Sequence, residues 1–356
     1  MDADLPRKAA VLGKPIGHSK SPLLHLAAYR ALGLTGWSYD RIECTGEQLP
    51  GLVDGLGPEW VGLSVTMPGK VAALEYATER TERAVQVGSA NTLVRVPGGW
   101  RADCTDVDGV TGALAEVGVT DLGGASAVVI GAGGTSRPAL RALADLGVDA
   151  VTVVARSADR AAASLACASE MGLRARHLGF DADALAAACA DAATVVSTVP
   201  PDAIAPFASA VAKAPVVFDA IYDPWPTPLA AAVQAAGGTV VDGLRMLLNQ
   251  AFGQVEQFTG RPARARRWRP RSRADAPFST APDPSPAQLG SALSGPLQVP
   301  SGGSVGAWES DCSAWRDCSP ASRRGGSCVA SPRRCRAGGS RSSSSASSRP
   351  DSPARR

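Results

Sequence analysis

The chain has 356 residues, which is room for about two domains, and 45% of them are hydrophobic, which is enough to build substantial cores. It has no run of 18 or more apolar residues and no apolar stretch of the signal-peptide kind near Met1, so we expect a soluble, cytoplasmic protein that does not enter a membrane. The formal net charge of +3 is unevenly spread, with +10 from Ala263 onward and −7 over residues 1–262.

Short apolar runs alternate with Ala/Leu-rich stretches of helical period over residues 1–262, which is typical of α/β architecture. The expected strands are Ala9–Leu12, Trp60–Ser64, Thr92–Val96, Ala127–Ile130, Val151–Ala155, Thr194–Ser197, Val216–Asp219 and Thr239–Val241. Helices are expected between them. We expect Ser21 to be an N-cap with Pro22 at the first helical position, and Thr105 or Asp106 to begin another helix.

Polar segments in the first third of the chain carry hydroxyl, amide, ammonium and carboxylate groups. They are Gly13–Pro22, Ser64–Lys70, Gly88–Thr92 and Asp103–Asp106. Such a set suits the binding of a small polyhydroxylated acid, and a lysine held in a turn after a strand can serve as an acid/base group. Taken singly, Lys70 is more typical of a solvent-exposed lysine and Asp106 of a helix cap.

The segment from Ala127 to Arg137 is the strongest nucleotide-binding signal, because a predicted strand runs into a glycine turn and then a helix. Gly131 allows the tight turn, Gly133 lets the backbone approach a pyrophosphate, and the helix that starts near Thr135 offers free N–H groups. Ser136 stands at the third glycine of the GxGxxG fingerprint and is still small enough for close packing. The pattern predicts a Rossmann-type domain.

The residues after the next strand indicate which dinucleotide is bound. Arg156 and Ser157 follow Ala155, with Arg160 one turn later, where an Asp or Glu would bind a free ribose 2′-hydroxyl. Guanidinium and hydroxyl groups suit a 2′-phosphate, and adenine can stack on an arginine plane. NADP is therefore favoured over NAD, with a merely solvated Arg156 as the alternative.

The cysteines show no CxxC pair for zinc binding or redox chemistry. We expect those before the tail to be buried or inert thiols: Cys44, Cys104, Cys167 and Cys189. No metal-ligand cluster is visible, so we expect no metal. His18 is expected to be a structural hydrogen-bonding residue of its turn, and His25 a packing or surface residue.

Residues 263–356 are rich in Ser, Arg, Pro and Gly without apolar periodicity, so we expect a disordered tail. Its 16 Arg could neutralise nucleic-acid phosphates, but it lacks interleaved aromatic residues and any recognisable binding motif. We therefore expect no nucleic-acid partner. A shifted reading frame in a GC-rich gene would also produce such a loss of pattern.

A series of further motifs keeps a consistent order and spacing along the chain. They are residues 13–22, 64–70 and 131–137, Asn91-Thr92, Thr105-Asp106, Ser197-Thr198-Val199-Pro200, Tyr222 with Thr227-Pro228-Leu229, and 243–247 leading to Gln250-Ala251. With these motifs the chain resembles the shikimate dehydrogenase family over nearly all of residues 7–262. Two features depart from the family: Cys104 stands where Asn is usual, and the tail does not resemble the helix that normally closes the chain.

The resemblance implies an α/β fold of two domains with the active site in the cleft between them. The expected parts are a substrate-binding domain at 1–106, completed by a helix at 243–262, a Rossmann NADP-binding domain at 107–242, and the tail at 263–356. The implied reaction is the NADP-dependent, reversible reduction of 3-dehydroshikimate to shikimate, on the route to aromatic amino acids. The implied assembly is a monomer or a homodimer.

The resemblance also implies roles for individual residues. Lys70 would be the acid/base group and Asp106 would orient it and the substrate. Substrate binding would fall to Ser19, Ser21 and Tyr222 at the carboxylate, and to Thr66, Asn91, Asp106 and Gln250 at the ring hydroxyls. The cofactor would lie against Gly131, Ala132, Gly133, Gly134, Thr135, Ala155, Arg156, Ser157, Arg160, Ala220 and Gly243.

Two other activities give different expectations. A quinate dehydrogenase, which usually prefers NAD, would be expected to have an acidic residue where Arg156 stands. A binding-only relative that senses the metabolite without turnover would be expected to lose Lys70 or Asp106, and both are present.

Overall fold

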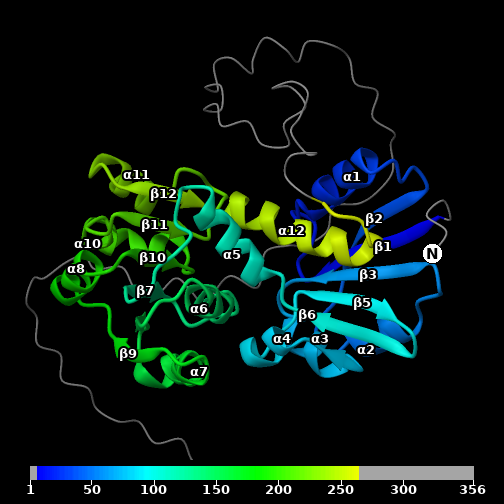
Figure 1. The fold of residues 1–356 in the computed structure, drawn as a ribbon, viewed down its shortest axis with the longest axis horizontal. Coiled ribbons are helices and arrows are strands. Elements are labelled where there is room, and N and C mark those ends of the chain that lie inside the picture. Colours follow the sequence, from blue (N-terminus) through cyan, green and yellow to red (C-terminus); the bar gives the residue numbers. More distant parts are fainter. Residues whose placement is uncertain (1–5, 264–356) are drawn as a thin grey trace, which may run out of the picture. The chain divides into compact units, whose positions relative to one another are not determined.

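The computed structural model describes residues 6–263, in which two sheets of six strands each are formed (Figure 1). The disorder expected for the tail concerns residues outside this range, apart from Ala263. Between residues 6 and 263 no helix is both long and apolar enough to cross a membrane.

The first sheet has the strand order β2-β1-β3-β5-β6-β4. Its strands are β1 (Arg7–Gly13), β2 (Trp37–Glu43), β3 (Trp60–Val65), β4 (Glu79–Arg80), β5 (Thr92–Val96) and β6 (Gly99–Asp103). β1 runs parallel to β2 and β3, whereas β5 runs antiparallel to β3 and β6. The carboxyl ends of β1 and β3 therefore meet at one edge, where the polar segments after Gly13 and Val65 begin.

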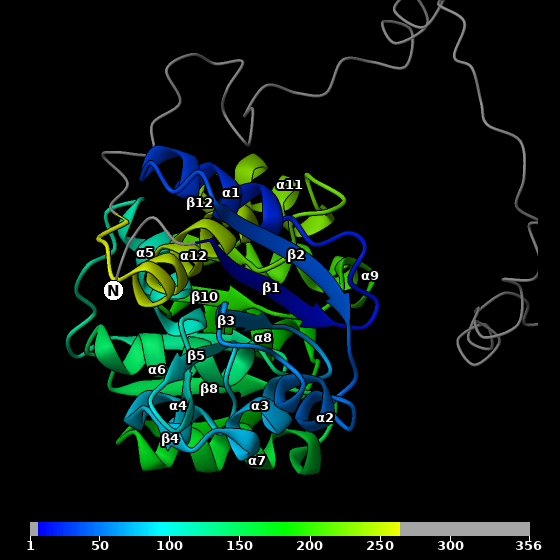
Figure 2. The ribbon, with the colours of Figure 1, turned by 90° about the vertical axis from the view of Figure 1, so that its right-hand side faces the viewer.

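Helices cover both faces of the first sheet. They are α1 (Ser21–Ala31), α2 (Leu49–Asp54), α3 (Lys70–Tyr76) and α4 (Glu82–Val87), together with the last helix, α12 (Gly243–Thr259). Alternate residues of β1 enter different cores: Ala10 and Leu12 pack with α2 and α3, whereas Ala9 and Val11 pack with α1 and α12. In the turned view of Figure 2, α1 lies beside β2.

The second sheet has the order β12-β11-β10-β7-β8-β9 with every pairing parallel. Its strands are β7 (Ser126–Ile130), β8 (Ala150–Val154), β9 (Arg174–Leu178), β10 (Thr194–Ser197), β11 (Val216–Asp219) and β12 (Thr239–Asp242). Counted from β7 this is the doubly wound order 3-2-1-4-5-6, whose direction switches between β7 and β10. Gly131 follows β7 at that switch point, as the glycine-loop prediction requires.

Helices cover both faces of the second sheet as well. They are α5 (Asp106–Ala115), α6 (Ser136–Asp145), α7 (Ala158–Glu170), α8 (Ala182–Ala190), α9 (Pro201–Ile204), the 3₁₀ helix η1 (Ala205–Phe207), α10 (Ala208–Val211) and α11 (Pro228–Ala235). Residues of α5, α6 and α7 share one core with the sheet, and residues of α8, α10 and α11 share the other. The continuous apolar strands reflect burial on both faces.

Helices α5 and α12 pack side by side between the two sheets (Figure 1). Glycine permits this close approach, because a Cβ on Gly109 would lie 2.9 Å from Met246 Cγ and one on Gly112 would lie 2.5 Å from Asn249 Oδ1. The start of α5 and the start of α12 are thereby held against the same cavity, described below.

Each predicted strand is present, with bounds that differ by at most two residues, and the α/β fold class is confirmed. Ser21 as an N-cap was wrong. Lys20 occupies the N-cap position without a side-chain bond, and Ser21 is the first helical residue. The Ser21 N–H donates to the hydroxyl of Ser19, two residues earlier. The last helix was expected to reach residue 262, but α12 ends at Thr259. Gly260, which follows it, adopts a left-handed conformation with φ of 66° and ends the helix.

Candidate active site

A cavity of about 210 Å³ opens where the carboxyl ends of β1 and β3 meet α5, α12 and the loop after β11. It is lined by every residue expected to act in catalysis or substrate binding: Lys70, Asp106, Ser19, Ser21, Thr66, Asn91, Tyr222 and Gln250. These residues come from segments far apart in the sequence. The structure therefore brings the predicted polar set together in one place.

Lys70 and Asp106 form a short ion pair at the wall of this cavity. Lys70 Nζ donates to Asp106 Oδ2 over 2.5 Å, and the two side chains are 16% and 8% exposed. Burial alone would lower the pKa of the Lys70 ammonium, but the charge and hydrogen bond of Asp106 outweigh it and raise that pKa above its ordinary value. The lysine is therefore a charged ammonium at neutral pH, paired with a carboxylate.

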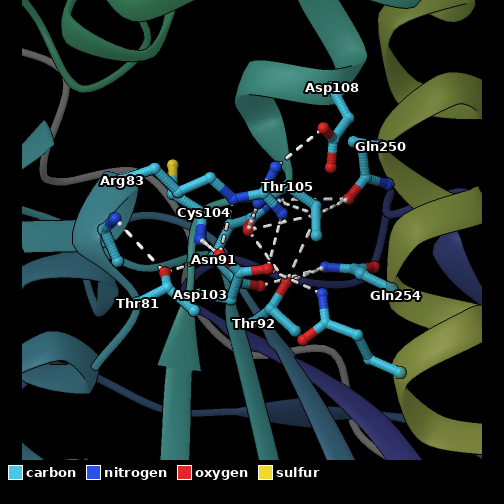
Figure 3. Close-up of polar contacts among 12 residues, drawn as sticks. Thr81, Arg83, Asn91, Thr92, Asp103, Cys104, Thr105, Asp108, Gln250 and Gln254 are labelled. Atoms are coloured by element: carbon cyan, nitrogen blue, oxygen red, sulfur yellow. Dashed lines mark hydrogen bonds and ion pairs between the residues drawn. The ribbon is translucent and has the colours of Figure 1, made fainter. Parts of the chain in front are cut away.

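Asn91 fixes the other oxygen of Asp106. Its Nδ2 donates to Asp106 Oδ1 over 2.8 Å and also approaches Thr105 Oγ1 and Gln250 Oε1, at 3.0 and 3.3 Å. Its Oδ1 accepts from the Thr105 N–H over 2.8 Å, so the amide can have only one orientation (Figure 3). Both oxygens of the Asp106 carboxylate thus accept hydrogen bonds, Oδ2 from the Lys70 ammonium and Oδ1 from the Asn91 amide.

Hydroxyl groups line another part of the cavity. Ser21 is 5% exposed, whereas Ser19 and Tyr222 are half-buried. Arg41 donates to the Ser19 carbonyl from Nε and Nη2, over 2.9 and 2.5 Å, which fixes the backbone that carries the Ser19 hydroxyl. Burial, with help from the nearby Asp223, raises the pKa of Tyr222, so the phenol keeps its proton and can donate it in a hydrogen bond.

The glycine loop after β7 has the geometry that its sequence predicts. Gly131 has φ of 105°, and a Cβ there would lie 2.4 Å from Thr198 Oγ1, so only glycine fits. Ser136 is fully buried, and its hydroxyl donates to the Gly133 carbonyl over 2.7 Å and contacts Ser164 Oγ on α7 at 3.2 Å. A Cβ on Gly133 would meet no atom within 4 Å, which leaves that backbone open to a ligand at the start of α6.

The residues expected to read the 2′-phosphate lie beyond the end of β8. Arg156, Ser157 and Arg160 are exposed, and Ser157 also caps α7 by accepting from the Arg160 N–H over 3.4 Å. Within the described chain neither arginine forms a salt bridge. Of the residues expected to contact the cofactor, Thr135, Ala220 and Gly243 line the cavity, whereas the glycine loop and the Arg156 segment do not.

Comparison with known proteins decides the family. Residues 11–93 match the shikimate dehydrogenase substrate binding domain, and residues 127–242 match the saccharopine dehydrogenase NADP binding domain. A shikimate dehydrogenase (NADP(+)) of Methanothermobacter thermautotrophicus is 34% identical over 70% of this chain and 90% of its own length. The chain belongs to the shikimate dehydrogenase family.

Solved structures of this family are similar as well. A shikimate 5-dehydrogenase from Mycobacterium fortuitum is 62% identical, with a TM-score of 0.70, over 74% of this chain and 97% of that one. The Mycobacterium tuberculosis shikimate dehydrogenase is 58% identical at the same TM-score and the same coverage. The resemblance stated from the sequence motifs is confirmed.

Sequence reasoning gave no individual role to two other polar residues that line the same cavity: Ser64, which was noted as the start of a polar segment, and Gln254. Tyr39 Oη donates to Ser64 Oγ over 2.5 Å, and Ser64 donates to Gln254 Oε1 over 2.7 Å. Gln254 in turn donates to the Asn91 carbonyl over 3.0 Å. The available signal was the spacing of Gln250 and Gln254, which places both amides on one face of α12.

The histidines have different environments. His25 is fully buried, with its ring stacked on Tyr39 at 4.0 Å between centroids, so of the two expected roles, packing or surface residue, it has the packing role. His18 is exposed at the cavity and makes no hydrogen bond to any residue from 6 to 263, so a structural hydrogen-bonding role was wrong.

Cys104, which stands where the family usually carries Asn, is fully buried beside the Lys70–Asp106 pair. Burial, reinforced by Asp106, raises the pKa of its thiol, so the sulfur stays neutral and packs in the core shared by α5 and α6. The other cysteines between residues 6 and 263 are also free and buried, as expected. In that range no group of three or more His, Cys, Asp or Glu is placed to hold a metal ion.

Proposed function

We propose that this chain catalyses the NADP-dependent, reversible reduction of 3-dehydroshikimate to shikimate. The observation that carries the proposal is the buried Lys70–Asp106 pair at the wall of a cavity that hydroxyl and amide side chains also line. The names of the relatives support the same reaction and the same cofactor.

The chemistry divides between the cofactor and the chain. Bound NADPH supplies the hydride that reaches the C3 carbonyl carbon of the substrate. The carbonyl oxygen becomes an alkoxide and needs a proton, and Lys70 Nζ donates it. In the oxidation direction the neutral amine of Lys70 accepts the hydroxyl proton. Asp106 holds the Lys70 side chain in place and stabilises its charge whenever the amine is protonated.

Substrate binding is assigned to the remaining polar residues of the cavity. Ser19, Ser21 and Tyr222 are donors of the kind that binds a carboxylate. Thr66, Asn91 and Gln250 are placed for ring hydroxyls, together with the free lone pairs of Asp106. Met246, which is 9% exposed, adds an apolar side chain to the wall of the cavity.

The residues after β7 and β8 fit a dinucleotide. The open backbone at Gly133 and the start of α6 suit a pyrophosphate, and the arginines after β8 suit a 2′-phosphate. We assign the cofactor to 107–242, and the substrate to 1–106 with the helix in 243–262. Action as a cytoplasmic monomer or homodimer stays a prediction.

A four-way assay tests the proposal: shikimate and quinate, each with NADP and with NAD, followed by the absorbance of the reduced nicotinamide. We expect the highest kcat/KM for shikimate with NADP. Preference for quinate with NAD would replace this function by the quinate dehydrogenase alternative. Binding of shikimate without turnover under any of the four conditions would indicate a sensing role.

A further inference from the structure

The segment that ends at Asp106 begins with a second buried carboxylate, Asp103, which no role described above includes. Its side chain is 4% exposed. Arg83 donates to both of its oxygens, from Nε over 2.7 Å and from Nη2 over 2.5 Å. Thr81 and Gln257 add bonds of 2.7 and 2.6 Å, and the Cys104 N–H adds one of 2.8 Å. Both carboxylate oxygens of Asp103 therefore accept two or more hydrogen bonds from protein groups.

The same guanidinium has a second partner. Arg83 Nη1 donates to Asp108 Oδ1 over 2.7 Å (Figure 3). Asp103 closes β6, and Asp108 lies in the first turn of α5. Asp106 lies between them. Arg83 of α4 thus binds one carboxylate before Asp106 in the sequence and one after it, and Asp106 itself pairs with Lys70.

Hydrogen bonds within residues 103–108 and to Asn91 connect the residues held by Arg83 to the cavity. The Thr105 N–H donates to Asn91 Oδ1, and Asn91 Nδ2 donates to Asp106 Oδ1. Gln257, the third side chain that donates to Asp103, lies on α12 two turns after Gln250. The start of α5 is therefore tied to α4 and α12 at the same time as it meets the cavity.

We infer that Arg83, Asp103 and Asp108 are positioning residues for the reaction, which together set the place of Asp106 against Lys70. We call this set the Arg83 brace. The inference rests on the proposed function, because it assigns the brace to the proton-transfer step. A buried ion pair that served stability alone would change the unfolding free energy without touching that step.

Arg83→Lys is the first variant, because an ammonium keeps the charge but cannot fork to two carboxylates. We expect kcat to fall by about 10- to 100-fold, since a displacement of about 1 Å at a reacting group can cost 10²-fold. The KM for NADP should stay within about twofold, because the hydrogen bonds and ion pairs that the brace residues form in the described chain do not include residues 131–135. Asp108→Asn is the second variant. It removes only the outer grip, at a side chain that is 43% exposed, and should cause a smaller loss of kcat in the same direction.

A double-mutant cycle separates positioning from general weakening. If the brace acts through Asp106, Arg83→Lys should lower kcat in the wild-type chain but add little in an Asp106→Asn background. Glu116→Gln is the matched control. Glu116 also joins α5 to α12, through Asn249 Nδ2 at 2.8 Å and Arg245 Nη1 at 3.3 Å, but it lies at the far end of α5. We expect it to leave kcat unchanged.

The outcomes are distinguishable. An active wild type whose kcat survives Arg83→Lys and Asp108→Asn would overturn the brace alone, as would losses that multiply fully with Asp106→Asn. A wild type inactive with shikimate under all cofactor conditions would overturn the proposed function and the brace with it. If Arg83→Lys fails to fold, Asp108→Asn and its cycle with Asp106→Asn decide.

Discussion

The Lys70–Asp106 pair is a buried ion pair between two residues with ordinary sequence surroundings. Lys70 lies at the start of α3 and Asp106 at the start of α5, and only the fold brings Nζ and Oδ2 within 2.5 Å. Their family motifs could be recognised in the sequence. The grip of Asn91 on the second Asp106 oxygen could not, because it depends on how β5 and α5 meet.

At this scale we expect Lys70→Ala to lower kcat by about 10²-fold or more, since a general acid/base group contributes roughly 10²–10⁴-fold. Asp106→Asn should act in the same direction, because it keeps the shape but removes the charge that holds the ammonium. Steady-state kinetics with shikimate measures kcat and KM for both variants, and fluorescence titration with NADPH measures their cofactor binding. A rise in KM with unchanged kcat would argue against the proton-transfer role.

Arg156 gives the corresponding test for the cofactor. We expect Arg156→Ala to raise the KM for NADP by about 10- to 100-fold, as charged hydrogen bonds worth about 1.5–3 kcal/mol are lost, with little effect on NAD. Arg174→Ala is the control, since Arg174 is also exposed but begins β9, at the opposite end of the sheet from the glycine loop. Equal weakening of both cofactors would show that Arg156 does not read the 2′-phosphate.

Among the elements, β7 and β10, which were found from the sequence, differ in burial from β2 and β9, which were missed. β7 and β10 lie inside a parallel sheet and read as continuous apolar runs, so their existence was predictable. β2 and β9 are edge strands, whose sequences WSYDRIE and RARHL include exposed polar residues. Their pairing is fixed by the neighbouring strand, which no local pattern records. Ser64 and Gln254 were missed for the same reason, since only the docking of α12 on the first sheet makes them neighbours.

Docking of α12 on β3 can be tested at Gly62. A Cβ there would lie 2.1 Å from Cδ1 of Phe258, which is 4% exposed. We expect Gly62→Ala to lower the unfolding free energy by about 1–3 kcal/mol through overpacking, measured by urea denaturation. Gly51→Ala in α2 is the control, because a Cβ at that position meets nothing within 4 Å.

The Gly62 effect should depend on the facing ring. In a Phe258→Leu background, Gly62→Ala should cost less than in the wild type, because the smaller side chain leaves room for the new methyl group. Equal costs in the two backgrounds would mean that the loss arises in β3 itself and not at the contact with α12.

For the whole molecule, two buried groups link folding to acid. Burial opposes ionisation of Asp103, but the hydrogen bonds and charge of Arg83 outweigh it and lower the pKa of this carboxyl to about 2. Burial lowers the pKa of His25 to about 4, against the opposing hydrogen bond to the Ser21 carbonyl. Both folded-state pKa values lie below those of the unfolded chain. Protons therefore favour unfolding, first through His25 between about pH 6.5 and 4 and then through Asp103 between about pH 4 and 2.

We expect the unfolding free energy to fall by about 3 kcal/mol between pH 7 and pH 4 through His25 alone, since its pKa drops by about 2.5 units on folding. His25→Phe keeps a ring to stack on Tyr39 but cannot take up a proton, so its stability should depend less on pH in this window, even if it is lower at pH 7 because the bond to Ser21 is lost. His18→Gln, a change at an exposed side chain, is the control for the loss of one imidazole. Urea unfolding at several pH values between 7 and 4 measures the slope. A slope in His25→Phe as steep as in the wild type would place the acid sensitivity in other groups and contradict the assignment to His25.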